Sequence, residues 1–159
     1  MGFKDKLTSF KNKAVELKNK AVNSAATKLS ESSLVIKTKE DLDDIIAKSK
    51  NTTYTSEETF ETKTFVKHSI VIFSWKDTDF YKDALLQLPV LSAKAFASNI
   101  NLKMCNLDLK DLKKYKITEI PTLALFTNEK LEKLVVWEEN IKKIVKFLDL
   151  DIIRAIENI

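Results

Sequence analysis

The side chains that most often carry out chemistry are scarce in this sequence of 159 residues. It has one cysteine, Cys105, and one histidine, His68. A nucleophile needs a base beside it in space, and nothing in the spacing brings His68 to one. Cys105 follows Met104 in an alternating apolar pattern, so we expect a buried, protonated and unreactive thiol. We predict no catalytic residue, with thiol-dependent redox or glutathione-type chemistry at Cys105 as an alternative.

Phosphate, cofactor and metal sites lack their signatures as well. Gly2 is the only glycine, which excludes glycine-rich phosphate loops and the G-x-S-x-G turn of hydrolases. A single cysteine excludes a disulfide framework and a four-cysteine zinc site. Asp77, Asp79 and Asp83 lack the glycine and final glutamate of a calcium loop. We interpret them as acids at a helix start, and we predict no metal and no cofactor.

The net charge of +4 is carried by the first fifth of the chain. Residues 1–33 contain seven lysines and three acidic residues, which leaves 20 basic and 20 acidic residues for the rest. Arg154 is the only arginine, and a lack of guanidinium groups weakens bidentate recognition of phosphate or guanine. The pattern indicates a basic arm on a neutral domain, and we expect no nucleic-acid partner.

Residues 1–33, which we call the arm, predict a basic amphipathic helix. Neither glycine nor proline occurs between residues 3 and 33. Steps of four and three place one apolar stripe along a helix, and its members are Phe3, Leu7, Phe10, Ala14, Leu17 and Ala21. Such a helix is marginal alone and needs a surface that buries its stripe. That surface is a partner protein, an anionic membrane surface or the chain's own domain.

Residues 34–159 predict one domain in which strands and helices alternate. Apolar runs predict strands at 34–36, 70–73, 100–105, 122–126 and 134–137. Helical spacing or capping predicts helices that begin after Thr38, over 83–98 with a kink at Pro89, at 109–115 and over 141–159. The order indicates an α/β fold, with helices on both faces of a mixed sheet.

The segment 51–64 is polar and rich in threonine and serine. Its only large apolar side chains are Tyr54 and Phe60. We predict an extended, solvated loop here, longer than most connections between elements.

The order of these elements and several short motifs resemble thioredoxin. The motifs are Ile70-Val71-Ile72-Phe73-Ser74 before a helix, Asn106-Leu107-Asp108, Tyr115-Lys116-Ile117, and Ile120-Pro121-Thr122 at the start of a strand. The resemblance covers roughly residues 34–150 and implies a thioredoxin-like fold, a central mixed sheet flanked by helices. It also implies a cis peptide bond before Pro121, as thioredoxins have in this segment.

The resemblance also identifies what is missing. In thioredoxins a Trp-Cys-Gly-Pro-Cys motif follows the first central strand, and a helix N-terminus stabilises the first cysteine as a thiolate. Here residues 75–82 occupy that stretch. Either Lys76 and Asp79 replace the two cysteines, or Thr78 and Tyr81 do. Neither register contains a thiol, so dithiol–disulfide exchange cannot run at this place.

Two further family positions differ. The buried acid of thioredoxins is replaced by Ile70 or Ile72, and the glycine that follows the strand hairpin falls near Trp137. A bulky ring at that place would change the surface around Pro121. Exposed tryptophans favour a protein contact, because such rings supply interface hot spots. Core packing of both Trp75 and Trp137 is the alternative.

We therefore expect a redox-inactive thioredoxin-like protein that acts by binding. It would be a structural or adaptor subunit of a larger organellar or cytoskeletal assembly, docked through the arm. The predicted protein-binding residues are Phe3, Leu7, Phe10, Leu17, Trp75, Pro121 and Trp137. The C-terminal segment 148–159 is a second place for a contact. The alternative is a peripheral membrane protein anchored by the arm. We expect an intracellular, reducing compartment, the cytoplasm or the mitochondrion.

Overall fold

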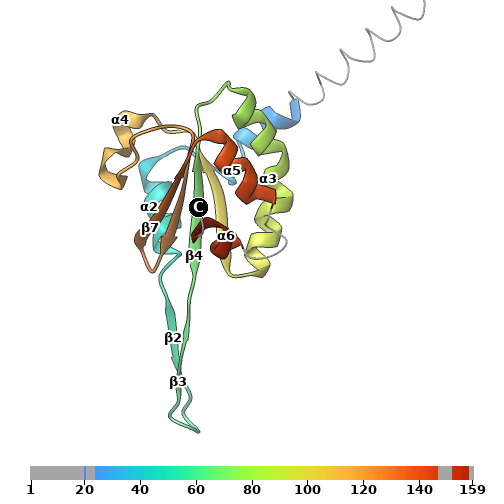
Figure 1. Cartoon of the computed structure of the whole chain (residues 1–159). Coiled ribbons are helices and arrows are strands. Elements are labelled where there is room, and N and C mark those ends of the chain that lie inside the picture. Colours follow the sequence, from blue (N-terminus) through green and yellow to red (C-terminus); the bar gives the residue numbers. More distant parts are fainter. Residues whose placement is uncertain (1–19, 21–23, 147–151, 158–159) are drawn as a thin grey trace, which may run out of the picture.

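A computed structural model of the chain describes residues 20, 24–146 and 152–157 (Figure 1). The predicted binding residues of the arm, Phe3, Leu7, Phe10 and Leu17, lie outside the described residues. Residues 24–30 are helical and lead into the domain. Among the described residues, no helix has both the length and the apolar character needed to cross a bilayer.

The domain is built on a five-stranded mixed sheet with the strand order β1-β5-β4-β6-β7. The strands are β1 (Val35–Ile36), β4 (His68–Phe73), β5 (Ile100–Cys105), β6 (Thr122–Thr127) and β7 (Lys130–Val136). The first three are parallel, while β6 is antiparallel to both β4 and β7. Five strands lie where the sequence predicted them, except that β7 begins at Lys130 and not at 134 and ends before Trp137. Together with their order they give the thioredoxin-like sheet that the resemblance implied.

Helices cover both faces of the sheet (Figure 1). One face carries α2 (Lys39–Ala47), α4 (Leu109–Leu112) and the 3₁₀ turn η1 (Lys113–Tyr115); the other carries α3 (Asp79–Ala97), α5 (Glu138–Lys146) and α6 (Ile152–Glu157). The central strand β4 alternates between the two cores. Ile70 and Ile72 join the cluster under α3, whereas Val71 and Phe73 join the cluster under α2. Burial on both faces explains the unbroken apolar run.

The helix starts follow from their capping residues. The Thr38 hydroxyl accepts a hydrogen bond of 3.1 Å from the N–H of Asp41, which confirms the predicted cap of α2. For α3 the prediction was wrong by four residues, because the helix begins at Asp79 and not at Asp83. Thr78 caps it, and the first turn buries Phe80 against the sheet. Pro89 lies inside this helix, as predicted.

The segment 51–64 is not a loop, which corrects the prediction. Two strands, β2 (Thr52–Thr55) and β3 (Thr62–Phe65), form an antiparallel hairpin that projects from the body of the domain (Figure 1). Threonine and aromatic residues favour extended backbone. All eight strand residues are exposed, so no alternation of apolar and polar residues marks these strands in the sequence.

The C-terminal region also differs from the prediction. A single helix was expected over 141–159, whereas the described residues contain two helices, α5 and α6. The α6 helix packs on the sheet: Ile156 is fully buried in the core under α3. The Lys133 ammonium of β7 donates to the carbonyl of Glu157 at 3.0 Å. Ile156 therefore packs in the protein's own core and is not available for the partner contact that was predicted for segment 148–159.

Candidate functional site

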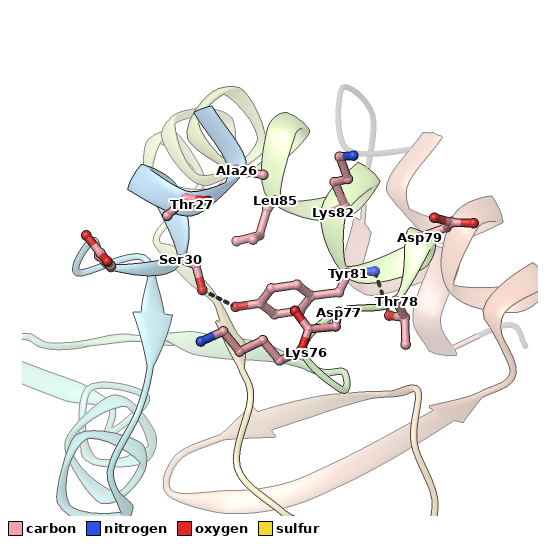
Figure 2. Close-up of a pocket in the computed structure, with 11 residues that line it drawn as sticks. Ala26, Thr27, Ser30, Lys76, Asp77, Thr78, Asp79, Tyr81, Lys82 and Leu85 are labelled. Carbon is pink, nitrogen blue, oxygen red and sulfur yellow. Dashed lines mark hydrogen bonds between the residues drawn. The ribbon is translucent and has the colours of Figure 1, made fainter. Parts of the chain in front are cut away.

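The first feature of the candidate site is the start of α3, just after β4. The Thr78 hydroxyl donates to the Trp75 carbonyl at 3.0 Å and accepts from the Tyr81 N–H at 3.2 Å (Figure 2). In thioredoxins the side chain at such a helix start is a thiolate. In this chain the side chain at the helix start is the Thr78 hydroxyl. The threonine hydroxyl in this place caps the helix.

Tyr81 has a buried ring in the first turn of α3. Its hydroxyl lies 2.7 Å from the Ser30 hydroxyl and accepts a 3.4 Å hydrogen bond from the Asn106 side-chain amide. Figure 2 shows that Ser30 belongs to the segment that precedes β1, which here lies over the start of α3. Sequence reasoning missed Ser30 and Asn106 because they meet Tyr81 only in the folded chain, Ser30 from 51 residues away.

A cavity of about 370 Å³ lies between that segment and the start of α3 (Figure 2). Lys76, Asp77, Thr78 and Lys82 line it together with residues of the segment. None of its lining residues is a cysteine or a histidine. Over the described residues, no group of three or more histidine, cysteine or acidic side chains is placed to hold a metal ion.

Cys105 lies away from this cavity. It is fully buried at the end of β5, in the core under α2, whereas Tyr81 belongs to the core under α3. Burial raises the pKa of the Cys105 thiol to about 11. At neutral pH the thiol is therefore protonated and out of reach of a substrate, which confirms the expected structural cysteine.

Trp75, Pro121 and Trp137 form the second feature, which we call the tryptophan edge. The sheet register places Phe73, Thr122 and Val136 side by side on β4, β6 and β7. Trp75 comes two residues after the first, Pro121 directly before the second and Trp137 directly after the third. Neighbouring strands lie about 4.8 Å apart. The sheet thus brings three residues, separated by up to 62 positions in the sequence, to one edge.

Both tryptophans of this edge are solvent-exposed, Trp75 by 49% and Trp137 by 69%. The alternative that both rings pack in the core is therefore wrong. The bond between Ile120 and Pro121 is cis, as the resemblance implied. The Thr122 hydroxyl donates to the Glu119 carbonyl at 2.6 Å and closes the turn around Pro121.

Trp137 lies near the place where the resemblance puts a glycine, and its backbone has a conformation that suits glycine. Its φ angle is 73°, in the left-handed region that bulky residues rarely adopt. Its carbonyl accepts the N–H of Ile141 at 3.2 Å and so begins α5. The chain therefore keeps a large exposed ring at a position where a residue without a side chain would be more stable.

Comparison with solved structures agrees with this fold. A designed protein matches 72% of this chain and 92% of its own, with 19% identity and a TM-score of 0.50. Oxidised thioredoxin from Plasmodium falciparum matches 70% of this chain and 93% of its own, with 14% identity and a TM-score of 0.47. Mitochondrial thioredoxin 3 from Saccharomyces cerevisiae matches 72% of this chain and 98% of its own, with 15% identity and a TM-score of 0.47.

At these identities the likeness concerns the fold alone. No family model and no curated protein matches the chain. The fold is thioredoxin-like by its sheet order and its cis-proline, and because the sequence holds a single cysteine, one chain cannot form a dithiol–disulfide couple.

Proposed function

We propose that this protein is a redox-inactive thioredoxin-like adaptor that binds a partner protein through the tryptophan edge. The exposure of Trp75 and Trp137 beside the cis-proline supports the proposal. Tryptophan is enriched among the few interface residues that carry most of the binding energy. The left-handed backbone at Trp137 adds to this, because the ring is kept at a cost in stability.

The buried thiol supports binding without thiol catalysis. A mixed disulfide with a partner requires an accessible thiolate, and Cys105 is fully buried with a raised pKa. The absence of catalytic chemistry remains part of the proposal. Insulin reduction by the purified protein tests it directly, and the expected rate equals that of the buffer. Reduction above that rate, lost in Cys105→Ala, would overturn it.

A comparative pull-down tests the edge. The full chain is compared with Trp75→Ala, with Trp137→Ala and with Val90→Ala, a control that shortens an exposed apolar side chain on α3. Truncation of a hot-spot residue costs about 2 kcal/mol or more, which is roughly a 30-fold loss of affinity. We expect both tryptophan variants to lose the specific partners that the Val90→Ala control keeps. Equal capture by all four proteins would refute the edge as the binding surface.

The arm is proposed to dock this adaptor on a larger assembly. Its apolar stripe would lie in a groove or coiled coil of that assembly. The variant Leu7→Asp/Phe10→Asp puts charges on the stripe and should abolish co-purification with the assembly. The double variant Lys11→Asp/Lys13→Asp changes charge at positions outside the stripe. It should reduce co-purification less than Leu7→Asp/Phe10→Asp does.

The excess of lysines in residues 1–33 favours a second candidate, attachment to an anionic membrane. Flotation with phosphatidylserine vesicles separates the two. Lipid-dependent flotation of the full chain that is lost on removal of residues 1–23 would favour the membrane. No flotation at low salt would leave the protein partner as the docking site.

A further inference from the structure

Within the described part of the chain, nothing covers either face of the β2–β3 hairpin, since all eight strand residues are exposed. A lone two-stranded hairpin is marginally stable in water. Its base is nevertheless fixed to the body of the domain. The Asn51 N–H donates to the Asn128 side-chain oxygen at 3.1 Å, and the Asn128 and Glu129 N–H groups donate to Ser49 at 2.9 Å. These hydrogen bonds join the start of the hairpin to the turn between β6 and β7.

The far end of the hairpin, residues 56–61, is the acidic tip. It carries Glu57, Glu58 and Glu61 and has no basic residue. The Ser56 N–H donates to the Glu61 carbonyl at 2.9 Å and closes the turn. Phe60 sits on this turn with a φ of 58° and an exposure of 82%. An exposed aromatic ring in a left-handed conformation, surrounded by carboxylates, has the composition of a contact point.

The base of the hairpin is basic, in contrast to its acidic tip. A hollow of about 680 Å³, the basic hollow, lies between the end of α2, the hairpin base and the turn from α3 to β5. Lys48, Lys50 and Lys67 line it, next to Phe96, which is 74% exposed. In the described part of the chain, none of these three lysines forms an ion pair. The lining of the hollow thus contains three lysines and no acidic side chain, and Asp44 lies one helical turn before Lys48.

Two further features lie in the hollow or next to it. Asn51 lines it, and its buried side-chain oxygen has no hydrogen-bond donor among the described residues. Lys103 lines a separate pocket with Lys48 and Asp41, and its pKa is lowered first by burial and then by the charge of Lys48, while Asp41 acts in the opposite direction. An acidic group that entered the hollow would offset the positive charge of the three lysines that line it.

We propose that two copies of this chain pair along their hairpins in antiparallel fashion, with the acidic tip of each in the basic hollow of the other. A chain cannot fill its own hollow, because tip and hollow lie at opposite ends of one hairpin (Figure 1). A twofold axis between the copies forms both tip–hollow contacts at once, because each copy uses the same surface. Each tip brings three carboxylates to three lysines, and Phe60 to Phe96.

The sides of the hairpin suit this pairing. Directly opposed residues share a face, so Tyr54, Lys63, Thr52 and Phe65 lie on one face. The other face carries only threonines, Thr53, Thr55, Thr62 and Thr64. The aromatic face can meet its own copy across the axis. This surface lies at the end of β4 that begins with His68, opposite the tryptophan edge, so the pairing is independent of the proposed partner binding.

The contact is small and charged, so we expect a dissociation constant on the order of 10 μM that weakens as ionic strength rises. Sedimentation equilibrium of the full chain measures it, from micromolar to several hundred micromolar protein. The expected mass rises from 18.2 kDa toward twice that value. A monomer at the highest concentration, or a dimer indifferent to 50 or 500 mM salt, would overturn the proposal.

Charge reversal tests the geometry. One variant reverses the tip, with Glu57→Lys, Glu58→Lys and Glu61→Lys; the other reverses the hollow, with Lys48→Glu, Lys50→Glu and Lys67→Glu. Each variant alone opposes like charges and should be monomeric. Their equimolar mixture restores opposite charges at both contacts and should form a heterodimer. Because the changed residues lie on the surface, each variant should keep the circular dichroism of the parent.

A matched control separates this contact from general attraction. The variant Lys110→Glu/Lys113→Glu/Lys143→Glu changes the net charge as much as the hollow reversal, at exposed positions elsewhere. It should still self-associate, and it should not pair with the tip-reversed variant. A dimer that survives in either reversed variant, or a mixture that associates no better than the control mixture, would refute the hairpin pairing.

Discussion

The backbone of Trp137 allows stability and binding to be separated with one residue. Its φ of 73° costs a residue with a side chain about 1–2 kcal/mol relative to the usual conformations. Glycine avoids this cost, but its extra freedom in the unfolded chain removes about 0.4–1 kcal/mol of the gain. The ring is 69% exposed, so little packing is lost with it. Trp137→Gly should therefore stabilise the fold by about 0.5–1 kcal/mol.

For a chain of this size, that gain raises Tm by about 1–4 °C. Trp137→Ala is the matched control, because alanine removes the same ring and keeps the unfavourable backbone. Chemical denaturation and calorimetry should rank glycine above both tryptophan and alanine in stability. Partner binding should fall equally in the two variants. If glycine were no more stable than alanine, the assignment of a strained, functionally retained residue at this position would be wrong.

Three other perturbations test the remaining parts of the structure. Thr78→Ala should cost about 1 kcal/mol in denaturant unfolding, whereas Thr78→Ser keeps the cap and should cost little; equal losses would contradict the capping role. Ile156→Ala should cost roughly 2–5 kcal/mol because the side chain is fully buried, and a loss below 1 kcal/mol would mean that α6 is not part of the core. Since burial raises the pKa of Cys105 from 9.0 to about 11, the unfolded chain loses this proton first, and stability should fall as the pH rises from 9 to 11. Cys105→Val should show a shallower fall over this range in urea titrations at several pH values.

Much of the fold is readable from the sequence because the sheet is buried on both sides. The run Ile70–Phe73 and the alternation that begins at Ile100 reflect that burial directly. The cap at Thr38 is equally visible, because capping is a local interaction between a hydroxyl and an N–H three residues on. The cis bond before Pro121 came from the family motif and not from any physical pattern.

The parts that were missed depend on the absence of burial or on distant contacts. The hairpin strands bury neither face, so their threonines resembled a solvated loop. The early start of α3 was missed because Phe80 and Tyr81 pack on elements far along the chain. The three residues of the tryptophan edge were each predicted. Their exposure could not be predicted, because it depends on where β4, β6 and β7 end in the folded sheet. The basic hollow combines α2, the hairpin base and the end of α3, and no local signal predicts such a combination.

The hydrogen bond between Ser30 and Tyr81 has a mechanical consequence. It ties the segment ahead of β1 to the first turn of α3 at 2.7 Å. Tension applied to the chain upstream of residue 24 would reach this bond before it reached the sheet. A pull there would therefore act first on the Ser30–Tyr81 contact and on Leu29, which packs against the core under α3.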